Sequence, residues 1–359
     1  MDLSNLYDIT RIRIPENRDI INGLCMNRNE KVVPWDKKII KEIYDSINDN
    51  EWNLYHSLES TYNKLEKHFN IPKDNMLLLN GAEDGILKCF HAFIKENSNV
   101  GILDPTYAMY YVFSKVFKNN LFKISYKLNK NNVKLDKEYL FSILPKLDII
   151  FLANPNHMLD NLEKEDIVKI CKIAKENNTI VVIDEVAAGF GVYRSKELIS
   201  DFDNLLVINS FSKEYGLPSI RSGVLMGSEK LIKICSAIRF SYEISLFSKK
   251  AIEYLVDNYE IVEKYNESVM EGRKYFLDEL DKMNIKYNSD NSICVNVYFE
   301  DVDLKNYIVD KLREEEIYIK NYSESSFEGK YVNFITITMA PKEIMKIILE
   351  KILSITKDK

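Results

Sequence analysis

The sequence contains few of the residues that build disulfide frameworks or metal centres. Its 359 residues include five cysteines and four histidines. The cysteines are widely scattered and form no C-x-x-C pair, so we expect reduced thiols that pack as small apolar residues. The histidines show no paired-ligand spacing, which gives a zinc site little support. We therefore expect no metal.

Other absences exclude whole classes of partner. Lys and Arg number 49 against 55 Asp and Glu, which gives a net charge of −6 without a basic block. Binding to the phosphates of nucleic acid is therefore not expected. No apolar run comes near the roughly 18–20 residues that a membrane span needs, and the first residues do not resemble a secretory signal. These features predict a cytoplasmic protein with no nucleic-acid or membrane partner.

The residues that are present fit a globular protein of two domains. Hydrophobic residues make up 46% and charged residues 29% of the chain, a balance that argues against general disorder. At roughly 100–200 residues per domain, this length predicts two domains. Composition therefore indicates a cytosolic enzyme or binding protein and no more.

Short apolar runs alternate with helix-period segments between about residues 75 and 227. Runs that are apolar on both faces and are separated by helices predict a buried, largely parallel sheet. Between two of them, apolar residues from Ile167 to Ala174 keep the i, i+3, i+4, i+7 spacing of one helix face. This order predicts an α/β fold, with ligands beyond the carboxyl ends of the strands. The predicted strands include Ile149–Ala153, Ile180–Ile183, Leu205–Ile208 and Val224–Met226.

The character of the chain changes after about residue 241. The stretch from Ala251 to Met283 predicts a long amphipathic helix, short strand-like segments follow, and a helix at Lys342–Ile355 closes the chain. The N-terminal residues carry no complete core of their own and are expected to pack against this part. We therefore predict a large α/β domain over 45–240 and a small α+β domain formed by 1–44 with 241–359.

Polar groups follow the predicted strands of the large domain. Asp184 comes directly after Ile180–Ile183, and Lys213 closes the string Ser210-Phe211-Ser212-Lys213 after the strand that begins at Leu205. Arg221 lies shortly beyond the lysine. The other strand-end strings are Asn80-Gly81-Ala82-Glu83-Asp84-Gly85 and Asn154-Pro155-Asn156-His157.

This ordered set resembles the fold-type-I pyridoxal-phosphate (PLP) enzymes, specifically the histidinol-phosphate aminotransferase branch of the class I/II aminotransferases. The resemblance covers nearly the whole chain and includes Asn27–Glu30, Asn53–Tyr55, Pro105–Tyr110 and Tyr242–Ser245. It implies the fold-type-I architecture, PLP as the cofactor, and a homodimer with shared active sites.

The resemblance also implies roles for single residues. Lys213 would bond covalently to PLP, and burial with nearby positive charge would lower its pKa so that the neutral amine acts as the nucleophile. Asp184 would pair with the pyridine nitrogen and keep it protonated. Tyr107 would stack on the ring, and for Tyr110 and Tyr111 a simple place in the core is the alternative. The purely structural alternatives are that Lys213 is a solvated surface lysine and that Asp184 caps a helix.

The phosphate of PLP needs hydrogen-bond donors and positive charge. The resemblance implies that backbone N–H groups at a helix start supply part of this need, and that an arginine binds two oxygens at once. Tyr55 would reach the phosphate of the neighbouring subunit; the alternative is a surface or core aromatic. The other expected phosphate ligands are Ala82, Glu83, Ser210, Ser212 and Arg221.

Three departures from the family pattern concern the cofactor and the domain junction. The family usually reads N-P-x-N-P-T-G after the strand that ends at Ala153, and its second asparagine bonds the 3′-oxygen of PLP. Here His157 takes that position, and a histidine N–H can donate the same bond. The family's D-E-A-Y reads Asp184-Glu185-Val186-Ala187, so its tyrosine is absent. The asparagine that usually follows Tyr242 is Glu243.

The largest departure concerns the substrate carboxylate, which the family holds with an arginine in an R-[IV]-T-[IV]-G strand near the C-terminus. The corresponding segment here is Tyr331–Ala340, and Ile335 or a neighbour stands at that position. Isoleucine does not replace a bidentate guanidinium. Either Arg28, Lys320 or Lys330 takes over, or the substrate is held through another group.

Three functions are consistent with these residues. The first is a PLP-dependent aminotransferase that acts on a small, phosphorylated amine or carbonyl compound, such as a hydroxyketone phosphate, with Arg28 and Lys320 as substrate-binding residues. The second is a PLP-dependent decarboxylase similar to the phosphoserine and phosphothreonine decarboxylases, because a missing arginine would suit loss of the carboxylate. The third is a catalytically silent binding protein, against which the joint retention of Lys213, Asp184 and Arg221 argues.

Overall fold

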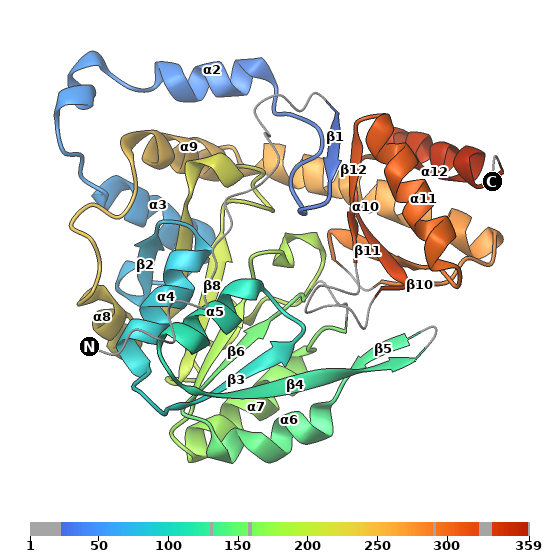
Figure 1. Ribbon diagram of the computed structural model, residues 1–359. Coiled ribbons are helices and arrows are strands. Elements are labelled where there is room, and N and C mark those ends of the chain that lie inside the picture. The colour runs from blue at the N-terminus through green and yellow to red at the C-terminus, as the bar shows by residue number, and fades with distance from the viewer. Residues whose placement is uncertain (1–22, 130–131, 157–159, 290–291, 323–331, 358–359) are drawn as a thin grey trace.

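The computed structural model describes residues 23–129, 132–156, 160–289, 292–322 and 332–357. Two β-sheets organise these residues (Figure 1). The larger sheet has eight strands in the order β2-β9-β8-β7-β6-β3-β4-β5, and the smaller has five in the order β1-β12-β13-β11-β10. The α/β class predicted from the sequence is confirmed.

The centre of the large sheet is parallel, and its edges are antiparallel. β3 pairs with β4 and β6, β6 with β7, and β7 with β8 in parallel register. β9 runs antiparallel between β2 and β8, and β5 folds back on β4. The strands are β2 (Met76–Leu79), β3 (Asn99–Asp104), β4 (Asn120–Asn129), β5 (Asn132–Leu135), β6 (Ile149–Ala153), β7 (Ile180–Asp184), β8 (Leu205–Ser210) and β9 (Gly223–Gly227).

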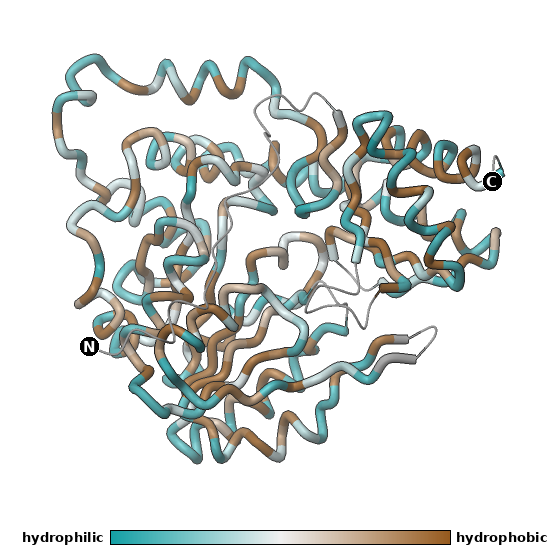
Figure 2. The backbone as a smooth tube through the Cα atoms, viewed as in Figure 1, coloured by the Kyte–Doolittle hydropathy of each residue, from teal (hydrophilic) through white to brown (hydrophobic). Residues whose placement is uncertain are grey.

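Helices bury both faces of this sheet. Along β7, Val181 and Ile183 belong to one hydrophobic core and Val182 to the other, because successive side chains of a strand point to opposite faces. The strands therefore read as continuous apolar runs, which Figure 2 shows as a brown group in the lower body. The core on one face includes residues of α3 (Glu59–Phe69), α6 (Lys137–Ile143), α7 (Lys164–Glu176) and α9 (Leu246–Asp257), and the core on the other includes residues of α4 (Ala82–Phe93), α5 (Ala108–Val116) and α8 (Glu229–Ser236). α2 (Lys37–Asp45) packs on the outside of α9 (Figure 1).

The small sheet combines both ends of the chain. β1 (Leu24–Met26) pairs in parallel with β12 (Ile317–Asn321), and the other pairs are antiparallel. The boundaries predicted at 44/45 and 240/241 stay predictions. The remaining elements are β10 (Tyr287–Asn288), β11 (Cys294–Tyr298), β13 (Phe334–Thr338), α10 (Tyr259–Lys282), α11 (Val302–Glu314) and α12 (Lys342–Lys357), and these helices contribute to a separate core.

The helix predicted from Ala251 to Met283 is two helices, α9 and α10. Asn258 separates them: its backbone N–H and its side-chain amide both donate to the carbonyl of Tyr254, at 3.0 and 2.8 Å. An asparagine side chain competes in this way with the helix hydrogen bonds, and the apolar periodicity continues across the break. α10 then crosses from the large core, where Val262 lies, to the small core. Within the described ranges, no helix is both long and apolar enough to cross a membrane.

The core of the small sheet gives a stability prediction. Ile335 is the second residue of β13 and is 0% exposed. Ile335→Arg places an unpaired guanidinium among apolar side chains, which we expect to lower the free energy of unfolding by about 3–5 kcal/mol. Ile335→Val is the matched control and should cost about 1 kcal/mol. Urea unfolding measures both, and an unchanged midpoint for Ile335→Arg would contradict the placement of this side chain in the core.

Candidate active site

A cavity of about 670 Å³ lies between the carboxyl ends of the large-sheet strands and the small sheet. Ala153, Asp184 and Ser210 line it where β6, β7 and β8 end, the edge at which α/β sheets bind ligands. The structure brings most of the predicted site residues together here. Those in its wall are Arg28, Ala82, Glu83, Tyr107, Asp184, Ser210, Ser212, Lys213, Arg221 and Lys320.

One end of the cavity is built to bind an anion. α4 begins at Ala82, and the first N–H groups of a helix have no partner within the helix. The Arg221 guanidinium lies on this turn, because a Cβ added to Gly81 would stand 2.7 Å from Nη2. Arg221 itself has φ 48°, a costly conformation for a residue other than glycine. Helix N–H groups and a guanidinium in one place suit a phosphate.

Asp184 is a buried carboxylate in the wall of the same cavity. It is 7% exposed, and its carboxylate accepts hydrogen bonds from the Tyr110 hydroxyl at 2.7 Å and the Val186 N–H at 3.1 Å. Burial raises the pKa of Asp184, and both hydrogen bonds oppose that rise. A carboxylate oriented in this way suits a protonated ring nitrogen.

Tyr110 belongs to a hydrophobic core, and its hydroxyl also reaches Asp184. It is fully buried, and its ring stands at 88° to that of Tyr107, with 6.3 Å between centroids. Tyr107 lies directly before α5. Residues three apart on a helix share one face, so this spacing is the sequence signal that places Tyr110 next to Tyr107. Tyr107 itself is 46% exposed and donates to the Glu83 carboxylate at 2.9 Å.

Lys213 reaches across the cavity to the small-sheet side. Its Nζ donates to the main-chain carbonyl of Arg28 at 2.6 Å, and Arg28 follows β1 closely. The side chain is partly buried and hydrogen-bonded, which argues against the alternative of a solvated surface lysine. The amine therefore stands between the two sheets, within the same cavity as Asp184 and Arg221.

Two buried polar atoms in the wall support the fit of a polar, phosphorylated ring. The Thr106 hydroxyl and the side-chain oxygen of Asn156 are buried and have no hydrogen-bond partner among the residues that the structure describes, and both residues line the cavity. Buried groups of this kind are costly unless a ligand or water pairs with them. Together with the anion site and Asp184, they match what PLP presents.

Some predicted residues lie elsewhere. His157 falls outside the described residues. Tyr55 is 83% exposed and stacks on Tyr242, with 4.4 Å between centroids, away from the cavity wall. Ala187 lines the cavity where the family has its tyrosine. Glu243 is buried and pairs with Arg239 at 3.0 Å.

Two neighbouring residues of the segment that corresponds to the missing arginine lie in different surroundings. Ile335 belongs to the small core, and its neighbour Thr336 lines the cavity. The Thr336 hydroxyl bonds the side-chain oxygen of Asn296 at 2.5 Å and the Tyr322 hydroxyl at 3.0 Å. Lys320 lies over the Tyr322 ring, with 4.6 Å from Nζ to the centroid. This wall presents an anchored hydroxyl and an ammonium.

Behind the cavity lies a second group of buried charges. Glu185 is 2% exposed and accepts a hydrogen bond from the Ser195 N–H. Its other oxygen has no partner in the described part of the chain. Burial raises the pKa of Glu185 to about 7, against the effect of the Ser195 hydrogen bonds.

The fold and the cavity together define a PLP enzyme of fold type I. The family model for aminotransferase class I and II matches residues 22–352. Histidinol-phosphate aminotransferase of Thermoanaerobacter sp. (strain X514) is 27% identical over 305 residues, which cover 83% of this chain and 84% of the relative. The enzyme of that name from Clostridium botulinum (strain 657 / Type Ba4) is 26% identical over 347 residues, which cover 94% and 92%.

Solved structures agree with this fold. Histidinol-phosphate aminotransferase from Sinorhizobium meliloti in complex with pyridoxal-5′-phosphate matches with a TM-score of 0.80 and 17% identity, over 94% of this chain and 92% of that one. The Clostridium acetobutylicum enzyme matches with a TM-score of 0.79 and 22% identity, over 94% and 100%. The chain belongs to the class I and II aminotransferase family. It is a PLP-dependent aminotransferase.

Glu185 gives a prediction about pH. The folded protein keeps a proton that the unfolded chain releases above its ordinary pKa of 4.5, so the stability that Glu185 contributes is lost as pH rises through about 7. The loss amounts to roughly 3 kcal/mol by about pH 8. Glu185→Gln should remove this loss. Urea unfolding of both proteins at about pH 4.5 and pH 8 measures it, and parallel pH profiles would contradict the raised pKa.

Proposed function

We propose that this aminotransferase transfers an amino group between an amino donor and a small carbonyl compound that carries a phosphate. The observation that supports this most is the convergence of Lys213, Asp184 and Arg221 on one cavity whose substrate-side wall carries Lys320. The relatives named for histidinol phosphate support a phosphorylated substrate. Their names do not favour the decarboxylase alternative.

The residues divide the work of holding the cofactor. The first N–H groups of α4, at Ala82 and Glu83, bind its phosphate with Arg221 and the hydroxyls of Ser210 and Ser212. His157 lies outside the described residues, so its donation to the 3′-oxygen stays a prediction. PLP, when bound, supplies an electron-withdrawing ring that stabilises negative charge on the substrate carbon.

Three side chains then act on the ring and the substrate. The Asp184 carboxylate keeps the ring nitrogen protonated, and the Tyr110 hydroxyl holds that carboxylate in place. The Tyr107 ring covers one face of the cofactor. The neutral Lys213 amine takes a proton from the substrate carbon and then donates that proton to a second carbon.

Lys213 is tested by its covalent chemistry. Borohydride reduction of the PLP-loaded enzyme followed by peptide mapping should label Lys213, and Lys213→Ala should abolish the label while PLP still binds through its phosphate contacts. Loss of the proton-transfer group should lower kcat by at least about a hundredfold. Lys172→Ala, on the exposed side of α7, is the control. A label on another lysine would show that the assignment is wrong.

The substrate-side wall supports recognition through a group other than an α-carboxylate. Thr336 offers a neutral hydroxyl that is already bonded to Asn296 and Tyr322. Of the cations expected for this role, Lys320 and Arg28 line the cavity, and Lys330 lies outside the described residues. An ammonium and a guanidinium suit a phosphate, so the phosphate of the substrate is the group that these residues hold.

Thr336→Arg tests this idea directly. A guanidinium at the cavity wall should bind α-amino carboxylates about ten- to a hundredfold more tightly, the value of one charged hydrogen bond, and should weaken the phosphorylated substrate. A panel of phosphorylated and unphosphorylated amines, followed by KM and by CO₂ release, makes the comparison. Micromolar binding of glutamate to the unmodified enzyme would contradict the proposal, and CO₂ release would favour the decarboxylase.

The active unit is proposed to be a homodimer in which Tyr55 completes the partner's phosphate site. Tyr55 is 83% exposed in the single chain, which a shared site would explain. Other large apolar side chains around it are exposed as well, and such patches mark protein interfaces. They include Tyr44, Trp52, Leu54 and Tyr242.

Mixed dimers test the shared site. Sizing at micromolar concentration should give about two chains, and Tyr55→Phe should weaken PLP binding about tenfold through loss of one charged hydrogen bond. Mixing Tyr55→Phe with Lys213→Ala chains should restore one site with the original affinity. No restoration on mixing, with each homodimer intact, would place Tyr55 in its own subunit's site.

A cytoplasmic location is also proposed. All five cysteines are free, and four of them are buried. This is the state of thiols in a reducing compartment.

A further inference from the structure

The residue after Lys213 occupies a second buried polar centre on the same loop. Glu214 is 2% exposed. Its carboxylate accepts hydrogen bonds from the Arg194 guanidinium and, at 2.6 Å, from the Tyr259 hydroxyl. Its side chain also lies so close to Gly189 that a Cβ there has no room. Three separate contacts therefore fix the position next to Lys213.

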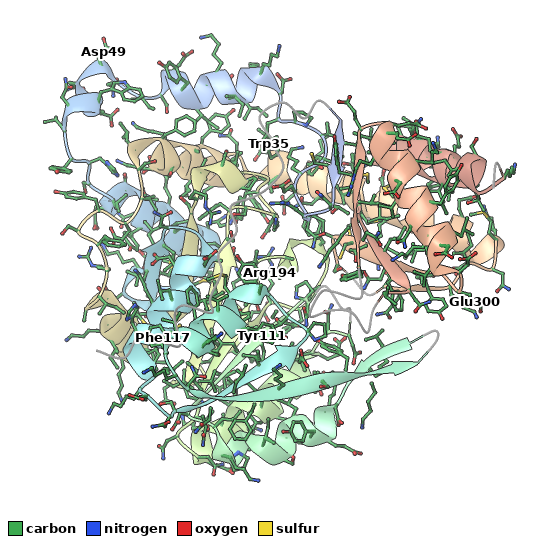
Figure 3. The ribbon with its side chains drawn as sticks, in the orientation of Figure 1. Trp35, Asp49, Tyr111, Phe117, Arg194 and Glu300 are labelled. Atoms are coloured by element: carbon green, nitrogen blue, oxygen red, sulfur yellow. The ribbon has the colours of Figure 1, made fainter. Side chains whose placement is uncertain are left out.

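These contacts come from the parts of the chain that define the site. Gly189 and Arg194 belong to the segment after Asp184, and Phe190 in that segment belongs to the core of the small sheet. Tyr259 is the first residue of α10, the helix that crosses from the large core to the small one. Figure 3 shows Arg194 in the middle of the molecule, between the two sheets.

The surroundings of Glu214 make the arrangement rigid. The Tyr259 ring packs edge-on against His68 at 4.6 Å and tilted against Tyr215 at 5.7 Å between centroids. The Arg194 side chain is 23% exposed and that of Glu214 is 3% exposed. Neither charge can turn to water without leaving the other buried and unpaired. The Lys213 loop therefore cannot shift independently of the segment after Asp184 or of α10.

We propose that Glu214 is a positioning residue, which sets the place of the Lys213 amine and couples it to the relative position of the two sheets. This inference rests on the proposed covalent role of Lys213. The functional consequence is that Glu214 governs how fast Lys213 bonds to the aldehyde of PLP, without governing how the phosphate is held. Among the described residues, the contacts given for Glu214 do not involve the start of α4 or Arg221. Ser212, an expected phosphate ligand on the same loop, is held by its own hydrogen bond, from its N–H to the Ser210 hydroxyl at 3.1 Å.

Two cofactor forms separate these effects. Pyridoxamine 5′-phosphate has the same phosphate and ring as PLP but no aldehyde, so it cannot bond to Lys213. Glu214→Gln and Tyr259→Phe are two separate variants, each prepared as apoenzyme. Each is mixed with PLP, and the borohydride-trapped product is measured over time. Affinity for pyridoxamine 5′-phosphate is measured in parallel. Glu263→Gln, an exposed residue one turn along α10 from Tyr259, is the matched control.

Both variants should trap PLP at least about tenfold more slowly, the change expected for one hydrogen bond to a charged group, with unchanged affinity for pyridoxamine 5′-phosphate. Equal losses with both cofactor forms would mean a general structural role and would overturn the proposal, as would an unchanged trapping rate. Tyr259→Phe keeps the Arg194–Glu214 pair and therefore serves if Glu214→Gln does not fold. Failure to label Lys213 in the unmodified enzyme would instead refute the proposed role of Lys213.

Discussion

Three neighbouring parallel strands, β6, β7 and β8, end at one edge of the large sheet, and the active site depends on that edge. Both faces of these strands are buried, so the interior positions are mostly apolar and the first charged groups come where each strand leaves the core. Asp184 closes β7, and the loop with Lys213 follows β8. Burial of the sheet thus decides where the groups that hold the cofactor meet.

The small sheet supplies the opposite wall of the cavity. Lys213 reaches the carbonyl of Arg28 beside β1, while β12 and β13 contribute Lys320 and Thr336. Asp184, Lys213 and Arg221 line the cavity as the resemblance implies, while departures from the family pattern stand in both parts of its lining, at Ala187 after β7 and at Thr336 in β13. Thr336 presents a hydroxyl to this wall, and the start of α4 lines another part of the same cavity.

Some site features could not be read from the sequence, because they depend on contacts between distant segments. Tyr110 looks like a core aromatic until its hydroxyl is found on Asp184. Ile335 and Thr336 are adjacent, and only the register of β13 against β11 shows which one faces the cavity. Glu214 pairs with Arg194 through a loop whose path no periodicity describes.

The sequence by itself determined the α/β class and the central strands, because apolar runs are local patterns, and the ordered strand-end motifs carried the resemblance that identified the family and its cofactor. Local patterns did not show that the stretch from Ala251 to Met283 breaks at Asn258, since the periodicity continues through it. Only the tertiary structure decided the substrate-side wall and the buried pair behind Lys213. These depend on how the two sheets face each other, and that arrangement is set by packing between residues far apart in the chain.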